Sequence, residues 1–311
     1  MLSILAGEAN RPLAAALAVQ LETDLAERTI ERFPDGEIHV AVKSGIRGHD
    51  VHIVQPLCPP VDAHLVETMM LADASHRAGA AHITAVLPYY GYARQDRRSA
   101  PGEPVGARVV ADLLAAVHVD SVLVVDPHTR ALEAMLSVPL EPISAIPLLA
   151  ATLRPELPDD AVVVAPDLGA VKRAERFAGL LDLPMAFVRK TRLSGDTVRA
   201  EGVVGDVAGR VPVIVDDMIT TGGTIVSATQ VLLDAGARAP VTVAATHGLL
   251  VGDALEALGQ LPLQRIHLTD SVPPPDSGAL PLVTTSLGEL LADAIRRLRR
   301  GTGLGQLGGY G

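Results

Sequence analysis

The sequence has few of the residues on which several classes of protein depend. It contains one cysteine, Cys58, which excludes an internal disulfide and a cysteine-rich metal site. It has no tryptophan and only 2% aromatic residues, so stacking platforms for single-stranded nucleic acid are scarce. Acidic residues (36) outnumber lysine and arginine (26), which gives a formal net charge of −10. That charge argues against nucleic acid as a partner, because such binding depends on neutralising phosphates.

Long hydrophobic runs are also missing. No stretch of about 18 uninterrupted apolar residues occurs, and residues 1–10 place no basic segment ahead of an apolar one. We therefore expect a soluble, cytoplasmic protein with no membrane partner. Hydrophobic residues make up 48% of the chain and charged residues 20%, which predicts a large buried core. A length of 311 residues exceeds one average domain, so two domains are expected.

Short apolar runs alternate with helical patterns along the chain. The runs predict buried strands at residues 2–6, 51–54, 83–87, 122–125, 161–165, 185–188, 211–215 and 241–245. Helices are predicted at residues 12–21, 65–78, 107–116, 170–181 and 224–235. This alternation is typical of an α/β protein whose mainly parallel sheets are flanked by helices.

Proline-bearing turns at residues 139–142 and 155–158 bracket the point where the alternation starts again. We therefore predict two similar domains, at residues 1–142 and 143–290. A C-terminal helix and a glycine-rich tail, which we expect to be disordered, follow at residues 291–311.

Residues 211–236 carry the strongest functional pattern. A predicted strand ends in Asp216 and Asp217, and the loop at residues 220–224, Thr-Thr-Gly-Gly-Thr, precedes a predicted helix. Glycines open the backbone to a ligand, and the N–H groups at a helix N-terminus favour a phosphate. The two carboxylates suit sugar hydroxyls that need acceptors. A turn with a helix cap is the simpler interpretation, but the whole pattern favours a site for a phosphorylated sugar.

Two motifs in the first half are candidates for an anionic ligand. Residues 32–37, Arg-Phe-Pro-Asp-Gly-Glu, predict a hairpin turn and by themselves nothing more. Residues 88–98 gather three of the four tyrosines and three arginines in one loop after a strand. Arginine forks match phosphate oxygens, and an aromatic ring with Gln and Asp could serve a base and a ribose. The alternative is a basic surface loop.

Three further polar positions follow predicted strands. His128 and Asp167 could mark the place of a metal–nucleotide, although a lone histidine is usually a satisfied structural residue. Residues 189–196, Arg-Lys-Thr-Arg-Leu-Ser-Gly-Asp, form a polar, basic segment. A mobile basic loop of this kind could stabilise charge on transferring phosphoryl oxygens, whereas a solvated hairpin is the alternative.

Taken together, these ordered motifs resemble the ribose-phosphate diphosphokinase family, whose two domains have the type I phosphoribosyltransferase fold. The resemblance runs from about residue 2 to about residue 300. It implies transfer of the β,γ-diphosphoryl group of Mg-ATP to the anomeric hydroxyl of ribose 5-phosphate, with AMP as the leaving group. It also implies Mg²⁺ as cofactor and a dimer-based homo-oligomer, for which a hexamer is one option.

The resemblance assigns a role to each motif. ATP would be held by Phe33, Asp35 and Glu37 of a neighbouring subunit together with Arg94, Gln95 and Arg97. Magnesium would be associated with His128 and Asp167, and the catalytic residues would be Lys190, Arg192 and His128. Ribose 5-phosphate would be bound by Arg192, Asp216, Asp217, Thr220, Thr221, Gly222, Gly223 and Thr224.

The sequence departs from the family pattern in two places. Thr220 stands where common bacterial and animal members have an acid, and its hydroxyl can still donate to phosphate. Residues 99–105 are short and lack the arginines of an anion effector site, which puts phosphate activation and ADP inhibition in question. Two other functions stay open: a phosphoribosyltransferase that consumes the diphosphate product, and a non-catalytic regulatory homologue.

Overall fold

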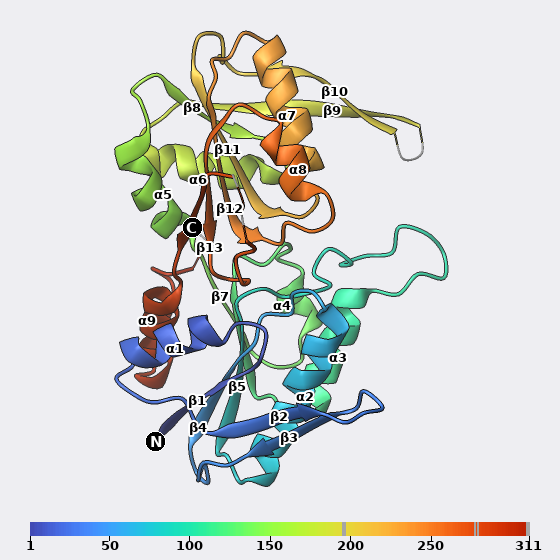
Figure 1. The fold of residues 1–311 in the computed structure, drawn as a ribbon, viewed down its shortest axis with the longest axis vertical. Coiled ribbons are helices and arrows are strands. Elements are labelled where there is room, and N and C mark those ends of the chain that lie inside the picture. Colours follow the sequence, from blue (N-terminus) through green and yellow to red (C-terminus); the bar gives the residue numbers. More distant parts are fainter. Residues whose placement is uncertain (195–196, 277, 279, 309–311) are drawn as a thin grey trace. The chain divides into compact units, whose positions relative to one another are not determined.

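The computed structural model describes residues 1–194, 197–276, 278 and 280–308, with the backbone alone at 190–194 and 197–201 (Figure 1). The chain divides into two compact units. Unit 1 comprises Met1–Ser144, Ser271–Pro273 and the chain from Ser286 onward, and unit 2 comprises Ala145–Asp270 and Pro274–Thr285. The C-terminal helix, which the sequence set apart from both domains, is thus part of unit 1.

Unit 1 contains a five-stranded parallel sheet with the order β1-β4-β5-β6-β7. Its strands are β1 (Leu2–Ala6), β4 (Asp50–Val54), β5 (His82–Leu87), β6 (Ser121–Val125) and β7 (Leu140–Ile143). The first four agree with the predicted runs. The turn predicted at residues 139–142 is wrong, because all of these residues except Pro139 belong to β7. Pro142 is tolerated there because β7 is an edge strand and a proline cannot donate a ladder hydrogen bond.

Helices cover both faces of this sheet (Figure 1). The core on one face includes residues of α2 (Val61–Arg77) and α3 (Gly106–Ala116), and the hairpin β2 (Arg28–Arg32)–β3 (Ile38–Val42) packs against α2. On the other face α1 (Arg11–Gln20) packs against β1 and against α9 (Gly288–Arg299). The short α4 (Leu132–Met135) follows β6. Across the described residues, no helix is both long enough and apolar enough to cross a membrane.

The described part of the tail beyond α9 packs against the rest of unit 1. Leu304 is buried, and the carbonyl of Leu307 accepts a hydrogen bond from the backbone N–H of Ser144 at 2.8 Å. Burial of the Leu304 side chain is favourable and offsets part of the conformational entropy that the glycines of the tail lose on folding.

Unit 2 contains a seven-stranded sheet with the order β10-β9-β8-β11-β12-β13-β14, parallel except for β9 with β10. Its strands are β8 (Ala161–Ala165), β9 (Met185–Ser194), β10 (Thr197–Val204), β11 (Val211–Ile219), β12 (Val241–Gly248), β13 (Leu263–Thr269) and β14 (Leu282–Thr285). One core contains α7 (Gly223–Asp234) and α8 (Ala254–Gly259), and the other contains α5 (Ile146–Leu153) and α6 (Val171–Leu181). Alternate residues of β8 and of the first part of β11 enter the two cores, so residues 161–165 and 211–215 are apolar.

The strand order of unit 2 reverses between β8 and β11. The chain leaves β8 through α6 and joins β9 on one side, whereas it leaves β11 through α7 and joins β12 on the other side. Ligands of open α/β sheets bind outside the carboxyl ends of the strands at such a switch point. The segments that follow β8 and β11 therefore flank the expected position of a ligand in unit 2.

Candidate active site

The acidic pair lies inside β11 and not beyond its end. The strand was predicted to stop at Val215, but it continues to Ile219, and Asp216 is in register with Ala245 of β12. On its other side β11 pairs with β8 only as far as Ile214. The carboxylates thus lie beyond the last residue that pairs with β8, where pairing with β12 still holds the backbone. This pairing fixes their position near the carboxyl ends of the strands.

Arg173 of α6 contacts both members of the pair. Its Nη1 lies 3.2 Å from Oδ1 of Asp216, and its Nη2 lies 3.8 Å from Oδ2 of Asp217. All three side chains are largely buried, with 17%, 14% and 6% of their surfaces exposed. A guanidinium fork matches two carboxylate oxygens at once, so Arg173 sets the orientation of both acids.

The environment of the pair favours one retained proton. Burial is the largest cause that raises the pKa of Asp216 well above its usual value, and the charge and hydrogen bond of Asp217 add to it. Arg173 and the backbone N–H of Asp217, which donates to Oδ1 of Asp216 at 2.8 Å, act in the opposite direction. Two carboxylates this close repel each other when both are ionised. The guanidinium of Arg173 reduces this repulsion and so favours carboxylate oxygens that can accept hydrogen bonds.

The loop after β11 leads directly into α7. Gly222 is the N-cap with φ of 79°, a left-handed conformation that suits glycine, and Gly223 begins the helix. A Cβ at Gly223 would meet nothing nearer than Oγ1 of Thr221 at 3.9 Å, so the space in front of this helix end is open. The first turn contains no acidic residue. A helix of this length with such an N-terminus favours an anion.

Asp167 lies at the corresponding place after β8. Its Oδ1 accepts hydrogen bonds from the backbone N–H groups of Gly169 at 2.9 Å and Ala170 at 3.3 Å. The carboxylate therefore caps the short helical turn Leu168–Ala170 that leads into α6. Asp167 and Arg173 approach the same switch point of unit 2 from one connection, because both belong to the segment between β8 and β9.

The hairpin of unit 1 has the turn that the sequence predicted. The backbone N–H of Phe33 donates to the carbonyl of Glu37 at 2.9 Å, and Oδ1 of Asp35 accepts from the N–H of Glu37 at 3.1 Å. Gly36 has φ of 95°. Phe33 is 50% exposed and contacts only the ring of His39 among the described aromatic pairs, with ring centroids 5.7 Å apart. An exposed phenylalanine on a rigid turn is a candidate contact for another molecule.

The loop after β5 exposes its charged residues and buries two tyrosines. Arg94, Gln95 and Arg97 are all exposed, and the Gln95 side chain lies against Gly106, where an added Cβ would be 2.6 Å from its Oε1. Tyr89 and Tyr90 are buried, and the hydroxyl of Tyr90 donates to the carbonyl of Ala107 at 3.2 Å. These two rings are therefore not available to a base, and the aromatic contact expected from this loop stays a prediction.

Tyr92, the third tyrosine of that loop, has a structural partner. It adopts φ of 65°, and its hydroxyl donates to Oδ1 of Asp62. This contact ties the loop to the first turn of α2, so the exposed arginines sit on a backbone held at several points.

His128 follows a distorted strand end. Asp126 has φ of 37°, an uncommon conformation for a residue with a side chain, and it immediately precedes Pro127. Its backbone N–H still donates to the carbonyl of Ile143 at 2.9 Å. The bend turns the chain away from the sheet and leaves His128 exposed at the carboxyl edge of unit 1. Strained backbone of this kind is concentrated at functional sites.

Lys190 and Arg192 have side chains outside the described residues. Their backbones belong to β9, in register with Ala200 and Val198 of β10. The basic segment is therefore part of a long antiparallel hairpin at the edge of the unit 2 sheet.

Arg173 is a residue that the sequence analysis missed. A signal was present, because Lys172 and Arg173 place two cations in the first turn of a helix, where the macrodipole disfavours them. Of the described residues, no group of three or more His, Cys, Asp or Glu is placed to hold a metal by itself.

The chain has two mainly parallel sheets flanked by helices, and one of them carries an acidic pair beside a glycine-rich helix N-terminus at its switch point. These features define a protein of the phosphoribosyltransferase-like α/β class. Residues 2–117 match the N-terminal domain of ribose phosphate pyrophosphokinase, and residues 197–308 match the phosphoribosyl synthetase-associated domain.

Relatives match over nearly the whole chain. A ribose-phosphate pyrophosphokinase of Caldanaerobacter subterraneus subsp. tengcongensis is 38% identical over 308 residues, 98% of this chain and 97% of that protein. One of Gloeobacter violaceus is 40% identical over 299 residues, 96% and 90% of the two chains. The crystal structure of phosphoribosylpyrophosphate synthetase from Mycobacterium smegmatis is 37% identical, with a TM-score of 0.90 over 96% of this chain and 99% of that one. This chain belongs to the ribose-phosphate pyrophosphokinases, an enzyme family.

Proposed function

We propose that the protein transfers the β,γ-diphosphoryl group of ATP to the anomeric hydroxyl of D-ribose 5-phosphate, giving 5-phosphoribosyl 1-diphosphate and AMP. The observation that carries the proposal is the acidic pair Asp216–Asp217, held by Arg173 beside the open N-terminus of α7. One half of this site suits the ribose hydroxyls and the other half suits the 5-phosphate, so a phosphorylated sugar satisfies both.

Ribose 5-phosphate would bind with its phosphate at the start of α7. The backbone N–H groups of Gly222 and Gly223 and the hydroxyls of Thr220, Thr221 and Thr224 are the donors. Asp216 and Asp217 accept from the ribose hydroxyls, and Arg173 is a positioning residue that orients both acids and reduces the repulsion between them.

ATP would bind at the carboxyl edge of unit 1. Arg94, Gln95 and Arg97 are the exposed donors for phosphate and base. Phe33, Asp35 and Glu37 of a neighbouring subunit would complete the adenine site, which requires a homo-oligomer. The exposure of Phe33 on a rigid hairpin supports this arrangement.

Magnesium fits the oxygen chemistry of the proposed site. Mg²⁺ keeps several waters and needs one or two carboxylates besides substrate phosphates, so a protein cluster of three ligands is not required. Asp167, whose carboxylate is oriented by two backbone N–H groups, and His128 are the residues that would associate with it. When bound, the ion neutralises charge on the phosphate oxygens.

The reaction proposed is an in-line displacement at the β-phosphorus of ATP. The anomeric oxygen forms a bond to this phosphorus, the bond to the bridging oxygen of AMP breaks, and the hydroxyl proton is released. Charge on the transferring oxygens needs positive donors, for which Lys190 and Arg192 are proposed. Catalysis then rests on positioning and on electrostatic stabilisation.

The deciding experiment measures AMP release from ATP by the purified protein with Mg²⁺, with and without ribose 5-phosphate. Release that depends on ribose 5-phosphate supports the diphosphokinase. Transfer of the labelled β,γ-phosphates to the sugar separates this activity from a phosphoribosyltransferase, which would not use ATP. Binding of ribose 5-phosphate with no AMP release would favour the non-catalytic homologue.

A further inference from the structure

Arg28 is a charged residue in a row of the β2–β3 hairpin that otherwise packs against the core. Opposite residues of an antiparallel pair share a face, and the register pairs Arg28 with Val42. The next pair on that face is Ile30 with Val40. Ile30, Val40 and Val42 are partly buried and pack against the core of unit 1. The Arg28 side chain is only 9% exposed, and because burying a guanidinium is costly, an arginine here needs a reason other than packing.

The guanidinium of Arg28 joins the hairpin to the end of another strand. Its Nε donates to the carbonyl of Ala6, the last residue of β1, at 2.8 Å, and its Nη2 contacts Oε1 of Glu8 in the loop that follows. Two donors of one planar fork are used, so both the position and the direction of the side chain are fixed. β1 belongs to the five-stranded sheet of unit 1, whereas β2 and β3 form a sheet of their own (Figure 1). Arg28 therefore holds the hairpin at the carboxyl edge of the five-stranded sheet.

The loop that presents Glu8 is itself held by buried side chains. The backbone N–H of Glu8 donates to Oε1 of Glu67 at 2.6 Å, and that of Ala9 donates to Oε1 of Gln55 at 3.0 Å. Gln55 and Glu67 are both buried, and Nε2 of Gln55 donates to the same oxygen of Glu67 at 2.8 Å. The backbone beside the Glu8 carboxylate is thus fixed to α2 and to the end of β4.

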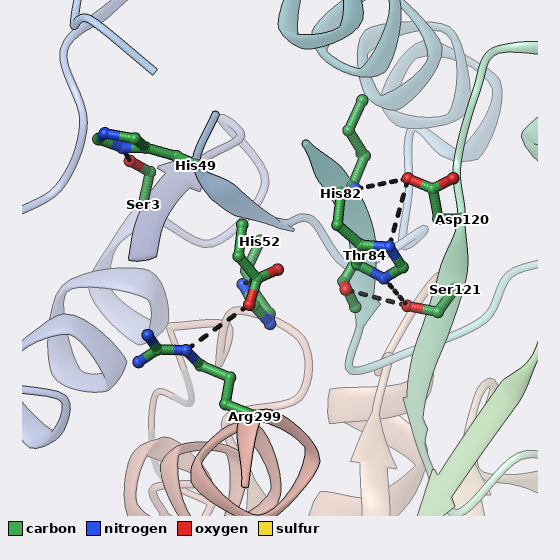
Figure 2. Close-up of polar contacts among 10 residues, drawn as sticks. Ser3, His49, His52, His82, Thr84, Asp120, Ser121 and Arg299 are labelled. Atoms are coloured by element: carbon green, nitrogen blue, oxygen red, sulfur yellow. Dashed lines mark hydrogen bonds and ion pairs between the residues drawn. The ribbon is translucent and has the colours of Figure 1, made fainter. Parts of the chain in front are cut away.

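Polar contacts at the amino edge of the five-stranded sheet have a different role. Thr84 of β5 and Ser121 of β6 share a hydrogen bond of 2.9 Å, and Nε2 of His82 lies 3.2 Å from Oγ of Ser121 (Figure 2). They join strands that the backbone ladder already holds together. Among the described residues, β2 and β3 have no ladder with this sheet, and they pack against α2. Apolar packing is non-directional, so it leaves the angle of the hairpin to directional contacts such as those of Arg28.

The direction of the hairpin decides where its tip lies. Phe33 is five positions beyond Arg28, roughly 16 Å along an extended strand. A change of about 5° in direction at the base therefore moves the tip by about 1.4 Å. Misplacement by about 1 Å can slow a reaction about 100-fold, even when the altered residue is far from the chemistry. A contact at the base of the hairpin can therefore control what the tip binds.

We propose that Arg28, held by Glu8, is a positioning residue for the ATP site: it sets the direction of the hairpin whose tip, Phe33 to Glu37, contacts ATP bound to a neighbouring subunit. This inference rests on the proposed function, which assigns the hairpin tip to ATP. Apolar replacement of a buried ion pair is often neutral for stability. Glu8 is also half exposed, so loss of Arg28 does not leave it as a buried, unpaired charge. Loss of the pair should thus weaken ATP binding in a protein that still folds.

The first test is steady-state AMP release by the purified full-length protein, with Tm recorded for each variant. Arg28→Met keeps a long, unbranched side chain and removes both contacts. We expect its KM for ATP to rise about tenfold, while the KM for ribose 5-phosphate, kcat at saturating ATP and Tm stay close to the wild type. A wild-type KM for ATP in this variant overturns the proposal. So does a lower Tm with equal losses in both KM values, which is the result of a merely structural role.

Variants of Glu8 test the same contact from its other side. Glu8→Ala should raise the KM for ATP severalfold. Glu8→Gln, whose amide oxygen can still accept from Nη2 of Arg28, should keep it within about twofold of the wild type. Glu27→Ala is the control, because it removes an exposed acid next to Arg28 in the sequence. A wild-type KM in Glu8→Ala, or an equal rise in Glu27→Ala, contradicts the role of the pair.

Mixed proteins test whether Arg28 acts on a neighbouring subunit. After subunit exchange, Arg28→Met with Lys190→Ala should form some sites that carry neither substitution, so activity at low ATP should exceed the average of the two parents. Arg28→Met with Phe33→Ala is the matched mixture. It supplies no intact hairpin and should give only the average. No gain in the first mixture, or an equal gain in both, overturns the assignment.

Amide hydrogen exchange separates this inference from the proposed activity, because it requires no turnover. The N–H of Lys43 donates to the carbonyl of Glu27 at 2.8 Å at the base of the hairpin. In Arg28→Met we expect exchange across residues 28–42 to be at least about threefold faster, with β4 and β5 unchanged. Exchange as slow as in the wild type would show that Arg28 does not hold the hairpin. A wild type that releases no AMP would instead overturn the proposed function, and with it the role for ATP.

Discussion

Arg173 and Asp216 form a largely buried ion pair at the switch point of unit 2, with Nη1 of the arginine 3.2 Å from Oδ1 of the aspartate. The two residues come from different elements, α6 and β11, so the contact joins the segment after β8 to the segment after β11. The same guanidinium reaches Asp217 at 3.8 Å. A ligand at the switch point of unit 2 would therefore contact two acids that share Arg173 as their cationic partner.

The first prediction concerns Arg173→Gln. Without the guanidinium the pKa of Asp216 rises further, because the opposing charge is gone, and the two carboxylates lose the contact that orients them toward the ribose hydroxyls. We expect the KM for ribose 5-phosphate to rise about tenfold or more, with a smaller change in kcat, and Arg173→Lys to restore part of the loss. Lys172→Gln, on the exposed side of the same turn, is the control and should match the wild type. A fall in kcat with unchanged KM would contradict the positioning role.

The second prediction follows from the raised pKa of Asp216. The folded protein binds this proton to a higher pH than the unfolded chain does. Stability therefore falls as the pH rises from the ordinary carboxyl value, about 4, through the raised pKa, and stays lower above it. Asp216→Asn removes this loss of stability, and Arg173 still has Asp217 as a partner. We expect the variant to have a higher Tm than the wild type near pH 7 and a difference that shrinks toward pH 4.

The control for that measurement is Asp253→Asn, an exposed acid before α8 that has no part in the pair. Its Tm should follow that of the wild type at each pH. A lower Tm for Asp216→Asn near pH 7, or a difference that does not vary with pH, would show that burial of the pair is not the source of the effect.

The sequence predicted the fold well because apolar periodicity is a local property. All eight predicted strands and all five predicted helices exist, and the loop at residues 220–224 leads into a helix as expected. The boundaries were less accurate. Asp216 and Asp217 lie within β11 because backbone pairing with β12 continues past the last apolar residue, and that pairing partner is not visible in the local pattern.

Features that depend on contacts between distant segments were not predictable. Arg173 meets Asp216 across 43 positions, and nothing in either local pattern identifies the other. Residues 88–98 place three tyrosines beside arginines, and the local pattern does not show that the ring of Tyr90 enters the core beside Ala107. Segment 139–142 looked like a turn because of its two prolines, whereas residues 140–143 form a strand at the edge of the sheet.

The third prediction separates the two glycines of the phosphate loop. Gly222→Ala forces a side chain into a left-handed conformation, for roughly 1–2 kcal/mol, and places a Cβ 3.2 Å from Cγ of Leu258. Its Tm should fall. Gly223→Ala has open space and a favourable helical position, so its Tm should not fall, but its methyl group lies where the phosphate would approach. We therefore expect Gly223→Ala to weaken ribose 5-phosphate binding without destabilising the protein. Unchanged binding would indicate that the phosphate does not bind at the N-terminus of α7.

The fourth prediction concerns Lys190→Ala. If this lysine acts on charge that develops only in the transition state, kcat should fall by orders of magnitude while the Kd values of ATP and ribose 5-phosphate change little. Steady-state AMP release together with equilibrium binding of each substrate distinguishes the two effects. A loss confined to KM would refute the catalytic role and leave Lys190 as a binding residue.

The last prediction tests whether Phe33 serves a neighbouring subunit. Because the side chain is 50% exposed, Phe33→Ala should leave Tm unchanged but raise the KM for ATP. A mixture of Phe33→Ala and Lys190→Ala proteins provides the stronger measurement. If each active site combines the hairpin of one chain with the loop of another, some mixed sites contain neither substitution, and activity should exceed the average of the two parents after subunit exchange. Activity equal to that average would mean that Phe33 acts within its own chain.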